Sequence, residues 1–249
     1  MPRRPAPPAD PGATAPRPRK KAGRPVAGGL TRERIVHAAL AHLDAVGLAA
    51  FSVRDVARAL DVFPTTVYWH MDSRDQLLAE VAGAVVQTAT PQRDGLDWET
   101  WLRRLLHGYR QALHQHPQVA PLLGAQLLSN AGLDLDLVDR LLAALHDAGA
   151  TDANIAAAYN ATIACMTGFV TLELAAPPDD NERWAQAHAQ RVHTADASAH
   201  PQVARHRHQL ANQAFILRWQ NGREVPLDAA FQAHVDIFIA GLKAFLRGA

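Results

Sequence analysis

The sequence predicts an all-α protein made of two helical domains that follow a proline-rich tail. Apolar residues recur at the three-to-four-residue spacing of helix faces, and no stretch sustains the alternation of a β-strand. Hydrophobic residues make up 48% of the 249, which excludes a fully disordered chain. The single cysteine, Cys165, excludes an internal disulfide framework and a cysteine-rich zinc module, and it suits a reducing compartment such as the cytoplasm.

Residues 1–29 are predicted to be a disordered, basic, proline-rich tail. They hold 8 of the 16 prolines and seven Lys or Arg, so almost nothing in them can be buried. Residues 1–90 carry 12 Lys or Arg against 8 Asp or Glu (net +4), whereas the rest carries 13 against 16 (net −3). Positive charge therefore gathers at the N-terminal end. No apolar stretch follows the first arginines, so a secretory signal is not expected.

Residues 30–88 are predicted to form a domain of short helices. Thr31 is a plausible N-cap for the first helix, which Gly47 ends. Ser52, with Asp55 three residues later, resembles a capping box at the start of a second helix.

A third helix is expected from Pro64 to about Met71, and Ser73 is expected to cap a fourth. A tight turn would join the second and third helices, the arrangement of a helix-turn-helix. Such a pair needs small or branched apolar residues on its inner faces, here Val53, Val56, Ala57, Leu60 and Val67. It also needs a polar and aromatic outer face, here Thr65, Thr66, Tyr68, Trp69 and His70.

Residues 89–249 are predicted to form a second helical domain, beyond breakers at Pro91 and Gly95. Its expected helices span Trp98–His116, Val119–Leu128, Leu135–Ala148, Asp152–Leu174, Asn181–Ala197, Gln202–Gln220 and Leu227–Leu246. The apolar segment from Ile155 to Ala176 is long enough to cross a membrane. Polar residues within and beside it, including Asn160 and Glu173, favour a buried helix instead, and no membrane partner is expected.

The segment from Leu30 to Glu80 resembles the DNA-binding domain of the TetR family of transcriptional regulators. The run TTVYWHMDSRDQLL is its most specific part, and it is especially similar to the tetracycline-repressor branch. The resemblance implies that Thr65 and Thr66 face the major groove, that Tyr68 and His70 touch phosphates and base edges, and that Trp69 packs on the sugar-phosphate backbone. It further implies that Arg54 reaches a base or phosphate and that Ser52 and Arg74 hold phosphates at helix N-termini.

Three departures from the family pattern are visible. Asp61 stands where the family usually has Gly, and Asp tolerates a positive φ better than most residues. Pro64 and Thr65 replace a Gln-Pro pair of the tetracycline repressor, so its operator cannot be carried over. Arg74 replaces the common Lys and keeps the charge.

Two features of the N-terminal part have a competing interpretation. Tyr68 and Trp69 could be core aromatics of a helical bundle, although neighbours about 100° apart on a helix cannot both face inward. The run from Arg19 to Pro25 partly resembles an AT-hook for the minor groove, but Ala22 stands where the hook has Arg. The alternative is a solvated basic tail that raises non-specific affinity by releasing counterions.

The second domain resembles the family's regulatory domain in length, helix count and its final apolar helix, which implies a homodimer and a small-molecule effector. The alternative is that the apolar face of the last helix packs only on its own domain. That face comprises Phe231, Val235, Phe238, Ile239, Leu242, Phe245 and Leu246. Residues that could line an effector cavity, or else form plain core, are Trp101, Leu105, Tyr109, Gln126, Tyr159, Asn160, Thr162, Met166 and Phe169.

No metal site and no cofactor are expected. His206 and His208 point about 200° apart on a helix and cannot easily share a metal ion. The stretch from Val119 to Gly124 lacks the histidine that the resemblance would supply, and Glu173 is one place off register, which argues against a magnesium–tetracycline ligand.

The function predicted from the sequence is a ligand-responsive repressor that binds a palindromic double-stranded DNA operator as a homodimer and that a small-molecule effector releases. A transcriptional activator, or a constitutive DNA-binding regulator without a ligand, would share the same N-terminal domain. An all-helical enzyme is the remaining alternative. No Ser-His-Asp set, phosphate-binding glycine loop or paired-carboxylate site supports that alternative.

Overall fold

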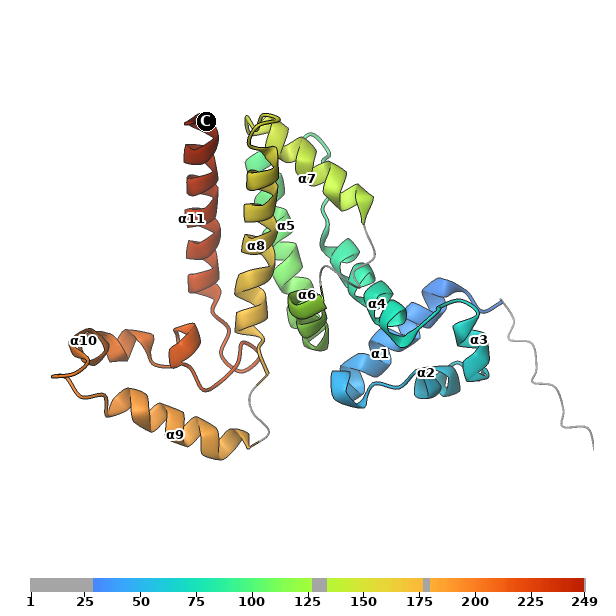
Figure 1. Ribbon diagram of the computed structural model, residues 1–249, viewed down its shortest axis with the longest axis horizontal. Helices are drawn as coiled ribbons and strands as arrows, with labels where there is room; N and C mark the ends of the chain where they lie inside the picture. Colours follow the sequence, from blue (N-terminus) through green and yellow to red (C-terminus); the bar gives the residue numbers. More distant parts are fainter. Residues whose placement is uncertain (1–28, 127–133, 177–179, 249) are drawn as a thin grey trace, which may run out of the picture. The chain divides into compact units, whose positions relative to one another are not determined.

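Helices form every regular element in the part of the chain that the computed structural model describes, residues 29–126, 134–176 and 180–248 (Figure 1). The all-α prediction is therefore confirmed. Contacts separate Met1–Leu30 from a second unit that begins at Thr31, and the described helices all belong to this second unit. The predicted disorder of the tail falls on residues outside the described ones.

The N-terminal elements are α1 (Arg32–Ala50), α2 (Val53–Ala59), α3 (Pro64–Tyr68) and α4 (Arg74–Ala89). Two predicted caps are confirmed. The Thr31 hydroxyl accepts from the N–H of Arg34 at 3.3 Å, and the Ser73 hydroxyl accepts from the N–H of Gln76 at 3.0 Å. These bonds satisfy donors that a helix start leaves open.

Gly47 leaves the helical conformation at φ +76° and ψ 169°, as predicted, and a short second helical stretch follows it to Ala50. Two other local predictions need correction or refinement. Ser52 occupies the N-cap position of α2 but makes no side-chain cap bond, and Asp55 pairs with Arg58 instead of closing a capping box. The third helix ends at Tyr68, well before Met71.

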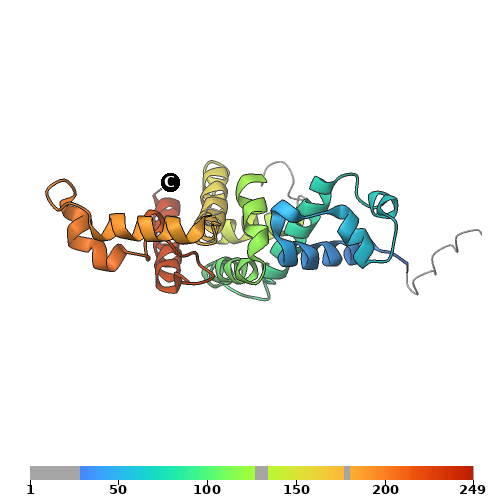
Figure 2. The ribbon, with the colours of Figure 1, turned by 90° about the horizontal axis from the view of Figure 1, so that it is seen from below.

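The C-terminal elements begin with α5 (Trp98–Gln115), η1 (Pro117–Val119), α6 (Ala120–Gln126) and α7 (Leu135–Asp147). They continue with α8 (Ile155–Glu173), α9 (Asn181–His193), α10 (Pro201–Leu210), η2 (Phe215–Leu217) and α11 (Asp228–Arg247). In both ribbon views α8 and α11 lie side by side, and the two helices run antiparallel (Figures 1 and 2). The predicted end of the sixth helix at Leu128 falls outside the described residues.

The predicted helix over Gln202–Gln220 is wrong beyond Leu210, because the backbone turns at Asn212 with φ +58°. The Asn212 side chain explains the turn. Its Oδ1 accepts from the N–H of Trp219 and the N–H of Gln220, both at 3.1 Å, and its Nδ2 donates to Gln220 at 2.7 Å. An asparagine that tolerates a left-handed conformation and bonds backbone locally competes well with helix continuation.

Helices α5, α8 and α11 form the core of the C-terminal part. Trp101, Leu105 and Tyr109 of α5 are buried, and Phe169 of α8 packs edge-on against Phe231 of α11 with ring centroids 5.3 Å apart. By length and composition alone, α8 and α11 could also cross a membrane. Their inward faces are instead packed within this bundle.

Candidate functional site

The surface formed by α2 and α3 has an apolar inner side and an exposed outer side. Val53, Val56, Ala57 and Val67 are buried, whereas Trp69 is 88% exposed and Tyr68 is 46% exposed. The interpretation of these two aromatics as core residues is therefore wrong. Large aromatic side chains left in water are a costly arrangement that points to a binding surface.

The remaining predicted contact residues lie on or beside the same surface. Arg54 on α2 and Thr65 on α3 are exposed, while Ser52, Thr66 and His70 are half-buried. Asp61 holds the turn between the helices at φ +54°, as the sequence predicts for a residue standing in place of glycine. The turn brings the N-terminus of α3 to the surface, with Pro64 as its first residue.

Arg74 is half-buried and already engaged within its own domain. Its guanidinium donates to the carbonyl of Leu48 at 3.1 Å and lies over the Phe51 ring, 5.5 Å from the centroid. It also lies 3.7 Å from Asp75. Arg74 therefore ties α4 to the end of α1, and only the part of it that remains exposed is available for a phosphate.

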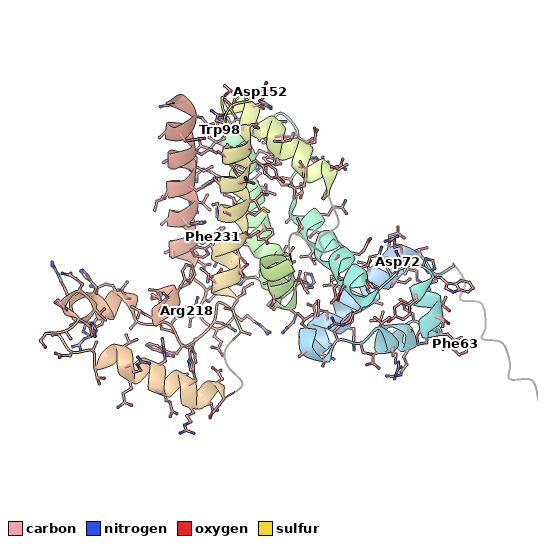
Figure 3. The ribbon with its side chains drawn as sticks, viewed as in Figure 1. Phe63, Asp72, Trp98, Asp152, Arg218 and Phe231 are labelled. Atoms are coloured by element: carbon pink, nitrogen blue, oxygen red, sulfur yellow. The ribbon has the colours of Figure 1, made fainter. Side chains whose placement is uncertain are left out.

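Sequence reasoning missed Phe63, which precedes α3 and is 77% exposed. Figure 3 shows its side chain pointing outward beside α3. Its position directly before Pro64, in the turn that leads into α3, is the signal that could have identified it.

The predicted effector-cavity residues divide into two groups. Trp101, Leu105, Tyr109, Thr162, Met166 and Phe169 are buried, and burial raises the pKa of the Tyr109 phenol. Tyr159 is half-buried and Asn160 is exposed on α8, away from that core; the side chain of Gln126 lies outside the described set. That these residues line an effector cavity stays a prediction.

A buried charged cluster joins α5, α8 and the start of α11. The carboxylate of Glu173 is fully buried and accepts two bonds from Arg110, at 2.7 and 2.8 Å, and one from the N–H of Leu227 at 2.8 Å. His114 Nε2 lies 3.1 Å from it, and Asp228 also pairs with Arg110. Burial alone would raise the pKa of Glu173, but these donors outweigh it and hold that pKa at about 2.

This cluster was not anticipated, because the helix pattern does not show which faces meet. The guanidinium of Arg110 bonds to both carboxylate oxygens of Glu173, which is an ion-pair arrangement. Across residues 29–126, 134–176 and 180–248, no group of three or more His, Cys, Asp or Glu has the arrangement of a metal site.

The N-terminal helices meet the C-terminal helices at two joints. His116 at the end of α5 bonds to Asp44 of α1 through Nδ1, at 2.7 Å. Gly108 of α5 passes so close to α4 that a Cβ there would lie 2.8 Å from the Ala89 carbonyl. Helix α4 packs on both α1 and α5, so it connects the N-terminal helices with the C-terminal helices.

Comparison with known proteins gives two family matches. Residues 35–81 match the bacterial regulatory proteins of the tetR family, and residues 90–246 match the tetracycline repressor-like C-terminal domain. An HTH-type transcriptional regulator of Saccharopolyspora erythraea is 30% identical over 145 residues, which are 58% of this chain and 61% of that regulator. The class C tetracycline repressor protein of Escherichia coli is 29% identical over 62% of this chain and 71% of its own.

Solved structures share the fold. Apo ActR from Streptomyces coelicolor has a TM-score of 0.68 and 22% identity, covering 88% of this chain and 99% of its own. BioQ solved with its double-stranded DNA operator has a TM-score of 0.52 and 31% identity, covering 62% of this chain and 92% of its own. Both domain matches, the second covering more than half of the chain, agree with the helix-turn-helix and the helical bundle described above, and the chain belongs to the TetR family of DNA-binding transcriptional regulators.

Proposed function

We propose that the chain is a ligand-responsive transcriptional repressor that binds a palindromic operator as a homodimer. The observation that carries the proposal is the exposed face of α3. The side chains of Thr65, Tyr68 and Trp69 are exposed to solvent, whereas Val67 is buried on the inner side of the helix. Thr65 and Thr66 would meet base edges or thymine methyls, and Tyr68, Trp69 and His70 would meet the backbone. Arg54, Ser52 and the exposed part of Arg74 would hold phosphates.

The exposed sides of α8 and α11 support the homodimer. The predicted face of α11 is only partly available, because Phe231, Val235, Ile239, Leu242 and Leu246 are buried in their own chain. The opposite side of α11 exposes Ala233, Ile237, Ala240, Gly241, Ala244 and Phe245. The adjacent side of α8 exposes Ala157, Asn160, Ala161, Ala164 and Gly168. These small residues let helices of a second copy approach closely, and Ile237, 73% exposed, gives an apolar anchor.

A dimer fits the proposed target. One α3 helix of five residues can read only a short half-site, so specific binding requires two copies that reach successive major grooves about 34 Å apart. The two joints between α1 or α4 and the C-terminal helices give a route by which a ligand could alter the spacing of the paired α3 helices. Cys165 is buried and forms no disulfide, which is consistent with a protein that works in the cytoplasm.

The test is binding to DNA flanking the gene that encodes the chain, measured by fluorescence anisotropy. The proposal predicts affinity at least about 1000-fold above that for random duplex at the same salt concentration. A reporter gene behind the same DNA then separates repression from activation. Equal affinity for both duplexes would contradict operator binding, and higher reporter output with the protein present would favour the activator.

A further inference from the structure

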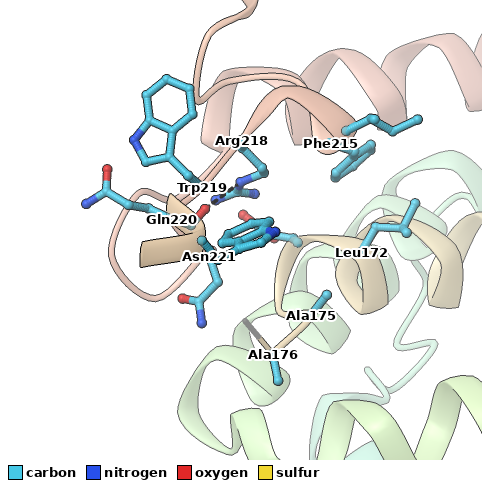
Figure 4. A pocket seen from close by; sticks show the side chains of 11 residues that line it. Leu172, Ala175, Ala176, Phe215, Arg218, Trp219, Gln220 and Asn221 are labelled. Atoms are coloured by element: carbon cyan, nitrogen blue, oxygen red, sulfur yellow. Dashed lines mark hydrogen bonds between the residues drawn. The ribbon is translucent and has the colours of Figure 1, made fainter. Parts of the chain in front are cut away.

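A cavity of about 390 Å³ lies where the end of α8 meets α9, η2 and residues 218–221 (Figure 4). None of the residues predicted to line an effector cavity borders it. Its volume falls in the range of small-molecule sites. It is built on the segment that the Asn212 turn creates, which is why helix periodicity alone did not reveal it.

Aromatic side chains form much of its wall. Trp184 stacks on His188 with ring centroids 5.1 Å apart and planes 19° apart. Phe215 packs edge-on against the buried Phe169, with centroids 5.0 Å apart. Each of these two rings packs against a second ring, and flat aromatic surfaces of this kind suit a planar ligand. Ile216, 85% exposed, adds apolar surface at the rim.

Arg218 contributes a charged group that, among the described residues, has no counter-ion within ion-pair distance. It is only 7% exposed; its Nε donates to the Gln220 carbonyl at 2.7 Å and its Nη2 donates to the Val225 carbonyl at 2.9 Å. Its Nη1 is buried and has no hydrogen-bond partner within the described part of the chain. The carboxylate of Glu173, which also borders the cavity, is already taken by Arg110.

Burial lowers the pKa of the Arg218 guanidinium, because the loss of hydration outweighs the distant charge of Glu173. A buried cation with a nitrogen that lacks an acceptor is costly for a folded chain unless something else accepts its hydrogen bonds. The charge and the missing acceptor both favour an anionic ligand over a neutral or cationic one.

The segment that carries Arg218 is held firmly. The N–H of Gly222 donates to the Glu173 carbonyl at 2.7 Å, and a Cβ at Gly222 would lie 2.4 Å from the Glu173 side chain. On the other side, Asn212 binds the N–H groups of Trp219 and Gln220. The guanidinium is thus positioned before any ligand arrives, which reduces the entropic cost of binding.

We propose that this cavity binds a planar aromatic carboxylate, with the rings against Trp184 and Phe215 and the carboxylate on Nη1 of Arg218. The proposal rests on the ligand-responsive function above and names the chemical class of the effector. Because Nη1 is also shielded from water in the free chain, the side chains around it must shift when the carboxylate enters. Gln220, exposed at the cavity mouth, lies beside Arg218 in Figure 4.

The test uses 2-naphthoate and its neutral counterpart 2-naphthamide as probes, with the full-length protein. Binding is measured by calorimetry and by quenching of tryptophan fluorescence, to which Trp184 and Trp219 at the cavity contribute. We expect naphthoate to bind at least about tenfold more tightly than the amide, because only the anion pairs with the guanidinium.

Arg218→Met should abolish that preference, and Arg218→Lys should keep part of it. The matched control is Arg205→Met on the exposed side of α10, which should bind naphthoate as the unmodified protein does. Circular dichroism and thermal melting verify that each variant is folded. Equal binding of the two probes, undiminished naphthoate binding by folded Arg218→Met, or no binding of naphthoate at about 5 mM would each overturn the site.

Operator binding in the same samples keeps the two proposals apart. Naphthoate binding that depends on Arg218 but leaves operator affinity unchanged would support the site and contradict its role in DNA release. If the protein does not bind the operator even without a probe, the DNA-binding proposal is contradicted and the cavity proposal is not affected.

Discussion

The helix-turn-helix of α1–α4 and the segment from α9 to η2 differ in how their shape is specified. In the first, caps, a turn residue and buried branched side chains agree with one another along the chain, as Thr31, Asp61 and Val67 illustrate. In the second, Val192 is the only buried side chain of α9 and α10 has none. Side-chain bonds from Asn212 and packing against α8 determine its course. The candidate DNA-binding surface is thus encoded locally, and a ligand-sized cavity arises from long-range contacts.

The largest effect is expected for Glu173→Gln, which removes a long-range contact. The change removes the buried charge partner of Arg110 and leaves only the exposed Asp228, and removal of one member of a buried pair costs about 3–5 kcal/mol of unfolding free energy. Denaturant unfolding measures the loss. The matched control is Asp236→Asn, an exposed partner of Arg103, which should cost less than about 1 kcal/mol. Equal losses for the two variants would contradict a structural role for the buried cluster.

The same residue predicts a pH dependence. Because the pKa of Glu173 is lowered from 4.5 to about 2 in the folded chain, its contribution is complete above pH 4.5 and is lost as the pH falls toward 2. The shift corresponds to about 3 kcal/mol. The difference in unfolding free energy between the unmodified protein and Glu173→Gln should therefore shrink across that window. A difference that stays constant would be at odds with the lowered pKa.

The next effect concerns the exposed face of α3. Trp69→Ala and Tyr68→Ala should each weaken operator binding by about 10–100-fold, because each removes contacts worth about 1–3 kcal/mol. Their melting temperatures should change little, since both side chains are exposed. Arg74→Ala should lower both the operator affinity and the melting temperature, because the Arg74 guanidinium also contacts the Leu48 carbonyl and the Phe51 ring. Fluorescence anisotropy measures the operator affinity, and calorimetry measures the melting temperature. A strongly destabilised Trp69→Ala variant would contradict the exposed position of Trp69.

A smaller effect tests the loop behind the cavity. Gly222→Ala should cost about 1–3 kcal/mol, because its Cβ would collide with the side chain and the carbonyl oxygen of Glu173. Gly83→Ala, inside α4 with open space around it, should instead stabilise the protein by about 0.5–1 kcal/mol. Thermal melting distinguishes them. If Gly222→Ala were tolerated as well as Gly83→Ala, the segment that carries Arg218 would not be held as described.

The smallest effect concerns the turn between α2 and α3. Asp61→Gly should be neutral or stabilise slightly, whereas Asp61→Ala should cost about 1 kcal/mol, because only glycine and a few polar residues accept φ +54° readily. Chemical denaturation can resolve the difference. Identical stabilities for the two variants would mean that the turn relaxes to another conformation.

Most helix positions could be predicted from sequence because each depends on neighbours a few residues away. Asp97, for example, caps α5 by accepting from the N–H of Thr100 at 3.0 Å, and Trp98 begins the helix as expected. The break after Leu210 was missed because apolar spacing continues through it and the bonds of Asn212 prevail. Helix geometry required only that Tyr68 and Trp69 not both face inward, and the helix-turn-helix interpretation placed both on the outer face, where they are exposed.

The parts of the candidate sites that the sequence could not supply depend on which surfaces meet. No residue near Glu173 in the sequence indicates that Arg110 pairs with it, and none near Arg218 indicates that Trp184 lines the same cavity. Likewise, the apolar face of α11 was visible in the sequence, but only packing reveals that Phe231 faces inward while Ile237 faces out.

Operator recognition by two copies of the exposed face of α3 can be examined in a single experiment. Native mass spectrometry of the protein with operator duplex counts the bound chains, and hydroxyl-radical footprinting of the same complex maps the protected DNA. We predict two chains per duplex and two protected half-sites about one helical turn apart, with both signals lost in Trp69→Ala. A single chain per duplex, or one continuous protected stretch that survives in Trp69→Ala, would show that the proposed mode of DNA binding is wrong.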